Sequence, residues 1–178
     1  MSVSNKLVFQ VLQVVSWILF IGLLIRAGSL VLNMIFIAFM PQWVGDLNSD
    51  LDLGPLLEQS SWAFYSVFSL VIGVALAKAY LFYHVVALMG KLDLAHPFNR
   101  WVSDRIIQIS YYTLATGLLN YLGRTVTRNL DTHGYAIDRL PAYWSDAQAF
   151  ALMGAVIYII AVIFKRGVEL QDENELTI

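Results

Sequence analysis

The chain has 178 residues, of which 58% are hydrophobic and 13% are charged, and its formal net charge is −2. Soluble domains carry about 25% charged residues, so the composition argues against a domain surrounded only by water. The small net charge offers no field that would attract nucleic acid, and direct nucleic-acid binding is not expected. The absence of cysteine excludes disulfides and thiolate ligands.

Four apolar segments in chain order predict an all-α fold, a four-helix transmembrane bundle built as a single domain over residues 1–178. A helix needs about 20 apolar residues to cross a bilayer. The expected spans are 7–40, 60–90, 102–126 and 146–166. The third is the most polar of the four, and the first two helices are expected to be longer than the bilayer.

Basic residues predict the orientation of these spans. Six of them fall on the side of the two termini and three on the other side, which places both termini in the cytoplasm by the positive-inside rule. The six are Lys6, Lys91, Arg100, Arg105, Lys165 and Arg166, and the three are Arg124, Arg128 and Arg139. Residues 167–178 then form an acidic cytoplasmic tail.

Tryptophans lie near several expected span ends, as is typical of indoles at the headgroup level. Trp43 and Trp62 flank the first outer loop, and Trp101 opens the third span. Trp144 is expected to mark the outer boundary of the fourth span. The turn at His133-Gly134 and the helix start at Ser145-Asp146 are expected to precede that span.

Small and polar residues recur at helical spacing along each span. Small residues four apart let helices approach closely, and hydroxyls and amides bond across the gap. The stripes therefore indicate either packing seams or a polar cavity that holds a ligand, and both interpretations stay open. The candidate ligand-binding residues are Arg26, Asn33, Ser69, His84, Ser110, Thr113 and Asn120.

Arg26 is the main argument for a cavity. An arginine at the centre of a membrane helix costs about 2.5–3.5 kcal/mol on insertion scales, so it is expected to find a partner. The alternatives are snorkelling to the inner headgroups, or an interior partner such as an amide, a hydroxyl or a bound anion. Lys78, among apolar neighbours, is expected to snorkel.

The first outer loop carries a partial calcium motif. Asp46, Asn48 and Asp50 match its opening, but Leu51 and Leu57 stand where the motif needs glycine and glutamate. We therefore expect no metal site there, and its leucines are expected to fold back as a cap over the bundle. No cofactor fingerprint and no catalytic set is recognised, so the protein is not expected to be an enzyme.

Several stretches resemble one family of bacterial four-helix integral membrane proteins that is catalogued only as a domain of unknown function. They are KAYLFYHVV (78–86), HPFNRWVS (96–103), AGSLVLNMIF, LDLGPLLEQS and, most specifically, the GVELQDENELTI ending. The resemblance implies a multi-pass protein of the bacterial inner membrane. Members of the family are often encoded beside a very small helix-turn-helix regulator of the Cro/repressor type, which implies a membrane partner for a transcription factor.

The leading hypothesis is a non-enzymatic membrane sensor or sequestering partner of such a regulator, which binds through Glu169, Asp172, Glu173 and Glu175 in the tail. Docking of the tail on its own bundle, against the ends of the first two helices, competes with this interpretation. Two other functions stay open, a module that binds a lipid or a small anion and a structural subunit of a larger complex. The lipid bilayer is an expected partner, and self-association is left open.

Overall fold

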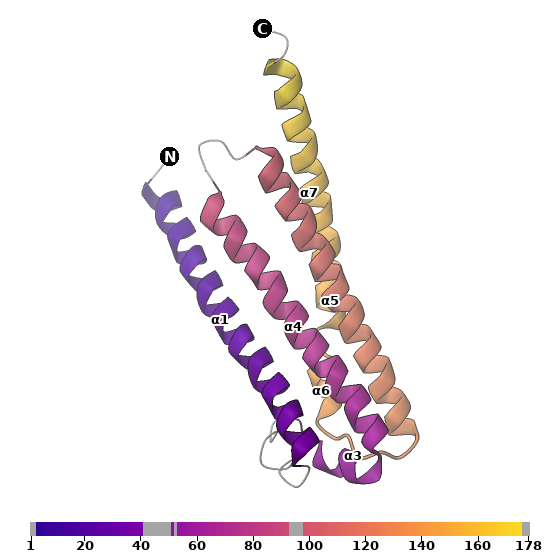
Figure 1. Ribbon diagram of the computed structural model, residues 1–178. Helices are drawn as coiled ribbons and strands as arrows, with labels where there is room; N and C mark the ends of the chain where they lie inside the picture. Colours follow the sequence, from indigo (N-terminus) through magenta and orange to yellow (C-terminus); the bar gives the residue numbers. More distant parts are fainter. Residues whose placement is uncertain (1–2, 41–50, 52, 93–97, 176–178) are drawn as a thin grey trace.

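A computed structural model describes residues 3–40, 51, 53–92 and 98–175 of the chain. Every element in this part of the chain is a helix (Figure 1). Four helices are long: α1 (Val3–Phe39), α4 (Ser61–Lys91), α5 (Arg100–Thr132) and α7 (Ala147–Glu175). Two are short: α3 (Gly54–Gln59) and α6 (Leu140–Tyr143).

The long helices pack in chain order. The principal contacts join α1 to α4, α4 to α5 and α5 to α7, so α1 and α7 are the outer members of the set (Figure 1). One end of the molecule holds the start of α1, the end of α4, the start of α5 and the end of α7 (Figure 1). We call it the terminal end. The α3 and α6 helices lie at the opposite end, which we call the α3–α6 end (Figure 1).

Three helical segments are long and apolar enough to cross a membrane: Leu7–Phe39, Ser61–Lys91 and Leu140–Glu173. The prediction of an all-helical fold is confirmed for the described residues, and three helical segments are long and apolar enough to cross a membrane, where four spans were expected. α5 is not among the three, because hydroxyl, amide and charged side chains occur along its length. At 1.5 Å per residue α1 and α4 are about 55 and 46 Å long, which exceeds a hydrocarbon core of about 30 Å.

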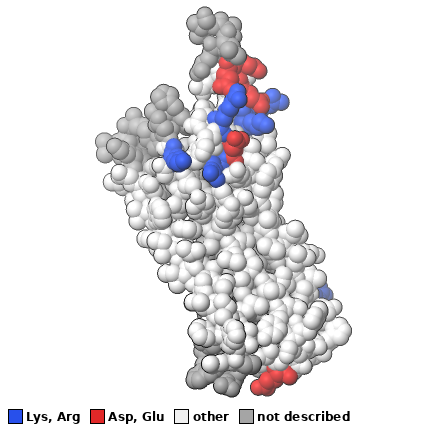
Figure 2. Space-filling model, viewed as in Figure 1, with Lys and Arg blue, Asp and Glu red and all other residues white. Residues whose placement is uncertain are grey.

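The outward faces of the apolar helices are exposed rather than packed. Ile18 and Ile25 on α1 are 64% and 66% exposed, and Leu152 on α7 is 70% exposed. Figure 2 shows a broad surface almost without charge between the two ends of the molecule, while most of the visible lysine, arginine and acidic side chains gather at the terminal end. Such a surface suits a lipid surrounding better than water.

A cluster of buried apolar side chains at the α3–α6 end joins α3 to α1, α4 and α6. Leu51, Leu53 and Leu56 belong to it, with exposures of 6%, 1% and 0%. The predicted folding back of the first-loop leucines is thus confirmed for these three. Residues 41–50 lie outside the described residues, and so do Asp46, Asn48 and Asp50, which open the calcium motif.

Local sequence signals explain where the helices begin and end. The Ser60 hydroxyl accepts a hydrogen bond from the Ala63 N–H at 3.3 Å and caps α4, and the Asn99 side chain accepts one from Val102 at 2.9 Å and caps α5. Gly134 has φ +78°, in the left-handed region, and turns the chain after α5. α7 begins at Ala147, directly after the predicted Ser145-Asp146 start.

The α5–α7 contact is the most extensive between the helices, and glycines face it. A Cβ built on Gly117 would lie 2.9 Å from the backbone nitrogen of Ala151, and one on Gly154 would lie 2.7 Å from Cγ of Leu114. Only glycine allows backbones to approach this closely. The seam therefore fixes how α7 is placed along α5.

Trp144 corrects the prediction of an interfacial residue. Its side chain is fully buried, and its Nε1–H donates a 2.7 Å hydrogen bond to the Thr127 hydroxyl. A Cβ on Gly123 would lie 2.5 Å from the indole, so glycine makes room for the ring. The prediction was wrong because the 133–146 segment folds back against α5 and carries Trp144 away from the surface.

Candidate functional site

Three charged residues meet halfway along the helices. Arg26 lies about 20 Å from the end of α1 at Phe39, and Lys78 lies about 26 Å from the start of α4 at Ser61, at 1.5 Å per residue. Asp146 is the residue directly before α7. The first turns of α7 lie opposite Gly117, in the middle of α5, and not at the end of α5. We call Arg26, Lys78, Tyr143 and Asp146 the central cluster.

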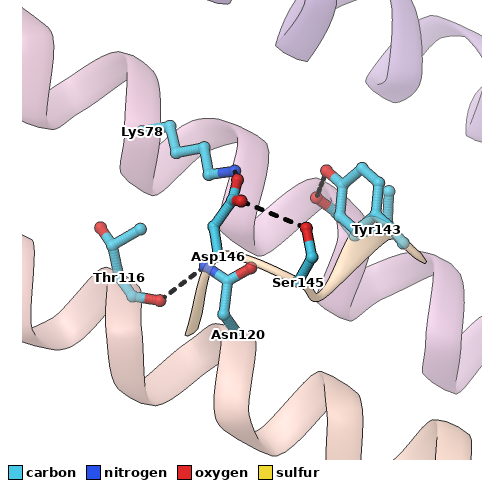
Figure 3. A network of polar contacts seen from close by, with 7 residues as sticks. Lys78, Thr116, Asn120, Tyr143, Ser145 and Asp146 are labelled. Atoms are coloured by element: carbon cyan, nitrogen blue, oxygen red, sulfur yellow. Dashed lines mark hydrogen bonds and ion pairs between the residues drawn. The ribbon is translucent and has the colours of Figure 1, made fainter. Parts of the chain in front are cut away.

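Lys78 and Asp146 form an ion pair. Nζ of Lys78 lies 3.5 Å from Oδ2 of Asp146, and Figure 3 shows the two side chains pointing toward one another from α4 and from the start of α7. The ammonium also lies 5.2 Å from the ring centre of Phe150. The Ser145 hydroxyl donates to Oδ1 of Asp146 at 3.2 Å.

The prediction that Lys78 snorkels to the headgroups is therefore wrong. Its side chain is 20% exposed and turns toward the start of α7. An ammonium in an apolar layer is stabilised more by a nearby carboxylate than by a long reach to the surface, since attraction between charges is stronger where water is scarce.

Arg26 has an aromatic partner among the described residues. Its guanidinium carbon lies 5.7 Å from the ring centre of Tyr143, whose hydroxyl donates to the Val71 carbonyl at 3.3 Å (Figure 3). Among the residues that the structure describes, Arg26 makes no ion pair. A cation over an aromatic face contributes about 0.5–2 kcal/mol, which offsets only part of the cost of a charge in an apolar layer.

Asn120, on α5, lies deep in the molecule near the start of α7. Its side chain is fully buried, and its Nδ2 donates to the Thr116 carbonyl at 2.8 Å (Figure 3). Its Oδ1 is buried without a hydrogen-bond partner in the described part of the chain. A buried acceptor left in this state costs about 1–3 kcal/mol.

The other predicted ligand residues on α5 do not gather around Arg26. Ser110 and Thr113 are buried, and their hydroxyls donate to the Ile107 and Ile109 carbonyls of the same helix at 2.7 Å each. Hydroxyls satisfied in this way can be packed without a ligand. For this stripe the arrangement favours the packing-seam interpretation.

The remaining predicted residues on α1 and α4 are also scattered. Ser69 is exposed and donates to the Ser66 carbonyl at 2.8 Å, and Asn33 is half-buried on α1. His84 is 3% exposed and belongs to a separate group nearer the terminal end. Of the seven candidates, only Arg26 belongs to the central cluster, and Asn120 lies at a similar depth on α5.

His84 joins α4 to α5. Its Nδ1 lies 2.8 Å from Nη1 of Arg105, and its ring stacks on Tyr112 with 4.7 Å between ring centres. A guanidinium only donates, so Nδ1 accepts and Nε2 carries the hydrogen. That Nε2 is buried and has no partner among the described residues.

The acidic tail continues α7 as a helix to Glu175. Asp172 accepts two hydrogen bonds from Arg100 on α5, at 2.8 and 3.2 Å, and Glu169 pairs with Arg166 at 2.9 Å. Val168 is 5% exposed, so the described part of the tail, up to Glu175, docks on α5 rather than on the ends of the first two helices, which was the competing interpretation.

The contacts of the other two tail acids, Glu173 and Glu175, are described less fully. Glu173 is exposed and has a further interaction, and the Glu175 side chain is outside the described part. Residues 176–178 lie outside the described residues. The structure thus places the tail acids on a helical extension, with two of them already paired within the chain.

In the described part of the chain, cavities also occur that no side chain of the central cluster lines. One of about 410 Å³ separates α5 from α7 at the terminal end, and it includes the buried Ser103, whose hydroxyl has no partner in the described part. One of about 450 Å³ lies beside Arg124 and Arg128 on α5. An apolar groove of about 320 Å³ lies between α1 and α4. In the described residues no three histidine or acidic side chains group as metal ligands would.

These features define a class, an all-α protein with three helices of membrane-spanning length and a charged cluster halfway along them. The chain belongs to the DUF2975 family, described as proteins of unknown function, which matches residues 51–178. The resemblance to a family of unknown function is confirmed over that range, and AGSLVLNMIF lies before it. No curated protein and no solved structure matches the chain.

Proposed function

We propose that the protein is a non-enzymatic sensor of the bacterial inner membrane that holds a small cytoplasmic helix-turn-helix regulator. The observation that carries the proposal is the continuity of α7. This one helix of 29 residues, about 44 Å long, runs from the central cluster to the charged tail. A change at one end of a rigid helix reaches the other end directly.

The membrane arrangement in this proposal has four spans. The three apolar helices cross the bilayer, and α5 crosses with them because α4 and α7 cover its polar side chains. Seryl and threonyl hydroxyls on α5 bond to carbonyls of their own helix, which lowers the cost of placing them in lipid. The terminal end is cytoplasmic, since six of the nine bases counted for topology fall there.

The tail supplies the surface for the regulator. A DNA-binding protein carries basic groups for phosphates, and carboxylates on the last turns of α7 can compete for those groups. Arg100 holds Asp172 in the state that the structure shows, so part of this surface is masked. A shift of α7 that separates Arg100 from Asp172 would raise the affinity for a basic partner.

The switch requires a ligand that binds one placement of α7 better than another. Binding energy shifts such an equilibrium only by the difference in affinity between the two states. The Lys78–Asp146 pair is the point at which a ligand can act, because it tethers the start of α7 to α4.

The test measures binding of the regulator to the purified protein in lipid nanodiscs. The probe is the fluorescently labelled helix-turn-helix protein encoded beside the gene of this chain, and a genome without such a neighbour would contradict the proposal. Changing Asp172, Glu173 and Glu175 together to their amides should weaken binding at least about tenfold at low salt, equivalent to about 1.4 kcal/mol.

The matched control removes acids from the other end of the molecule. Asp131 and Asp138 lie near the end of α5 and in the loop that follows it, and both are exposed. Their change to asparagine should leave regulator binding unaltered. Equal binding by the tail variant and the wild-type protein would refute the sequestering role.

A module that binds an anionic lipid or small molecule without any regulator is the second candidate. The surplus positive charge of the central cluster favours it. The two functions differ in outcome, since such a module would bind its ligand and ignore the regulator in the nanodisc assay.

A further inference from the structure

The central cluster has one positive charge more than it has negative charges. Arg26 and Lys78 contribute two cations, and Asp146 contributes the only carboxylate that pairs with either of them in the described part of the chain. In water such a surplus would be unimportant. In an apolar layer it attracts a counter-ion strongly, since there is little screening.

The two cations lie close to one aromatic ring. The guanidinium carbon of Arg26 is 5.7 Å and Nζ of Lys78 is 6.0 Å from the ring centre of Tyr143. Both side chains are long and have several rotatable bonds, so an anion bound beside the ring can draw the two charges toward it. Tyr143 and Phe150 supply an apolar wall beside them.

The cluster opens to the side of the molecule. Arg26 is exposed, and the Asp146 side chain is 56% exposed. α1 makes its principal contacts with α4, so the helix that carries Arg26 leaves the cluster uncovered on one side. A ligand can therefore enter laterally from the bilayer, and it needs an apolar body to do so.

The bond to Asp146 is loose enough to be exchanged. The distance of 3.5 Å between Nζ and Oδ2 exceeds the roughly 2.7–2.9 Å of a charge-assisted hydrogen bond. An incoming anion can therefore compete with Asp146 for Lys78. A second copy of the chain is a poor occupant of this face, because it would bring another surplus positive charge against the first.

We propose that the central cluster binds an amphiphile with a single negative charge, a carboxylate or a phosphate on an apolar body, through Arg26 and Lys78. Binding releases Asp146 from Lys78 and thereby frees the start of α7. The consequence for α7 rests on the proposed function, whereas the binding itself does not.

The test is native mass spectrometry and fluorescence titration of the purified protein in a non-ionic detergent. Oleate and phosphatidylglycerol are the two anionic probes, and they distinguish a fatty-acid carboxylate from a phospholipid phosphate. Methyl oleate is the neutral probe. One anionic probe should bind at least about tenfold more tightly than methyl oleate, as expected for a charge-assisted contact in an apolar layer.

Three substitutions test whether the anion binds through Arg26 and Lys78 in competition with Asp146. Arg26→Gln and Lys78→Gln should each weaken binding of that probe about tenfold or more. Asp146→Asn should strengthen it, because Lys78 loses its competitor and the cluster gains a second surplus charge. A merely structural role of Asp146 would instead weaken binding.

Arg124→Gln is the matched control, since this exposed arginine on α5 lies beside a different cavity. It should bind as the wild type does, and circular dichroism should show equal helix content in every variant compared. Equal binding of methyl oleate and both anions, or weaker binding by Asp146→Asn, would overturn the inference. Such a result would leave the proposed function standing if the tail variant still lost the regulator.

Discussion

Gly117 faces α7 across the α5–α7 seam, and its replacement by alanine tests whether that seam holds the fold together. A Cβ at Gly117 would lie 2.9 Å from the backbone nitrogen and 3.3 Å from Cα of Ala151. Neither atom can rotate away, because both belong to the main chain of α7. The helices must therefore move apart to admit the methyl group.

The size of the effect follows from two opposing contributions. Alanine is favoured over glycine in a helix by about 1 kcal/mol. Overpacking a close contact costs about 1–3 kcal/mol. Gly73 on α4 isolates the first contribution, because a Cβ there would meet nothing within 4 Å. Gly117→Ala should therefore be about 1–3 kcal/mol less stable than Gly73→Ala.

Unfolding by sodium dodecyl sulfate, in mixed micelles with a non-ionic detergent, measures this difference. Circular dichroism follows the helices, and the fluorescence of the five tryptophans, to which the buried Trp144 contributes, follows the tertiary packing. Gly154→Ala should behave as Gly117→Ala does, since its Cβ would lie 2.7 Å from Leu114. If the Gly117 and Gly73 variants unfold at the same detergent fraction, α5 and α7 do not pack as described.

Two further predictions concern single hydrogen bonds and ion pairs. Thr127→Val should destabilise the protein by about 1–3 kcal/mol in the same titration, because the buried Trp144 N–H loses its acceptor, while Thr125→Val at an exposed position should change little. Arg100→Gln should change the stability little, as is usual for an exposed pair, yet it should tighten regulator binding by releasing Asp172. Unchanged or weaker binding by the Arg100 variant would contradict the masking of the tail.

Local chemistry in the sequence was enough to predict how several helices begin. Asn99 directly precedes α5, and its short polar side chain forms the cap of that helix. Ser145-Asp146 was the predicted start of the fourth, and α7 begins at the next residue. These signals are readable because a cap depends on residues within one turn of each other.

Contacts between distant segments were not predictable in this way. The pairing of Lys78 with Asp146 and of Arg100 with Asp172 depends on how far α7 is shifted along its neighbours. Apolar periodicity indicates which face of a helix is packed, but not its longitudinal position against another helix. For the same reason the pattern could not show that Trp144 turns inward.

The α5–α7 seam connects the two ion pairs energetically. Gly117 and Gly154 set the position of α7 along α5, and that position places Asp146 beside Lys78 and Asp172 beside Arg100. Because α7 is one continuous helix, a displacement along its axis that lengthens one pair also disturbs the other. The Arg100–Asp172 pair is exposed at the terminal end and contributes little to the resistance. The glycine seam adds resistance from packing, so a ligand at the central cluster has to overcome that packing as well as the Lys78–Asp146 attraction that it replaces.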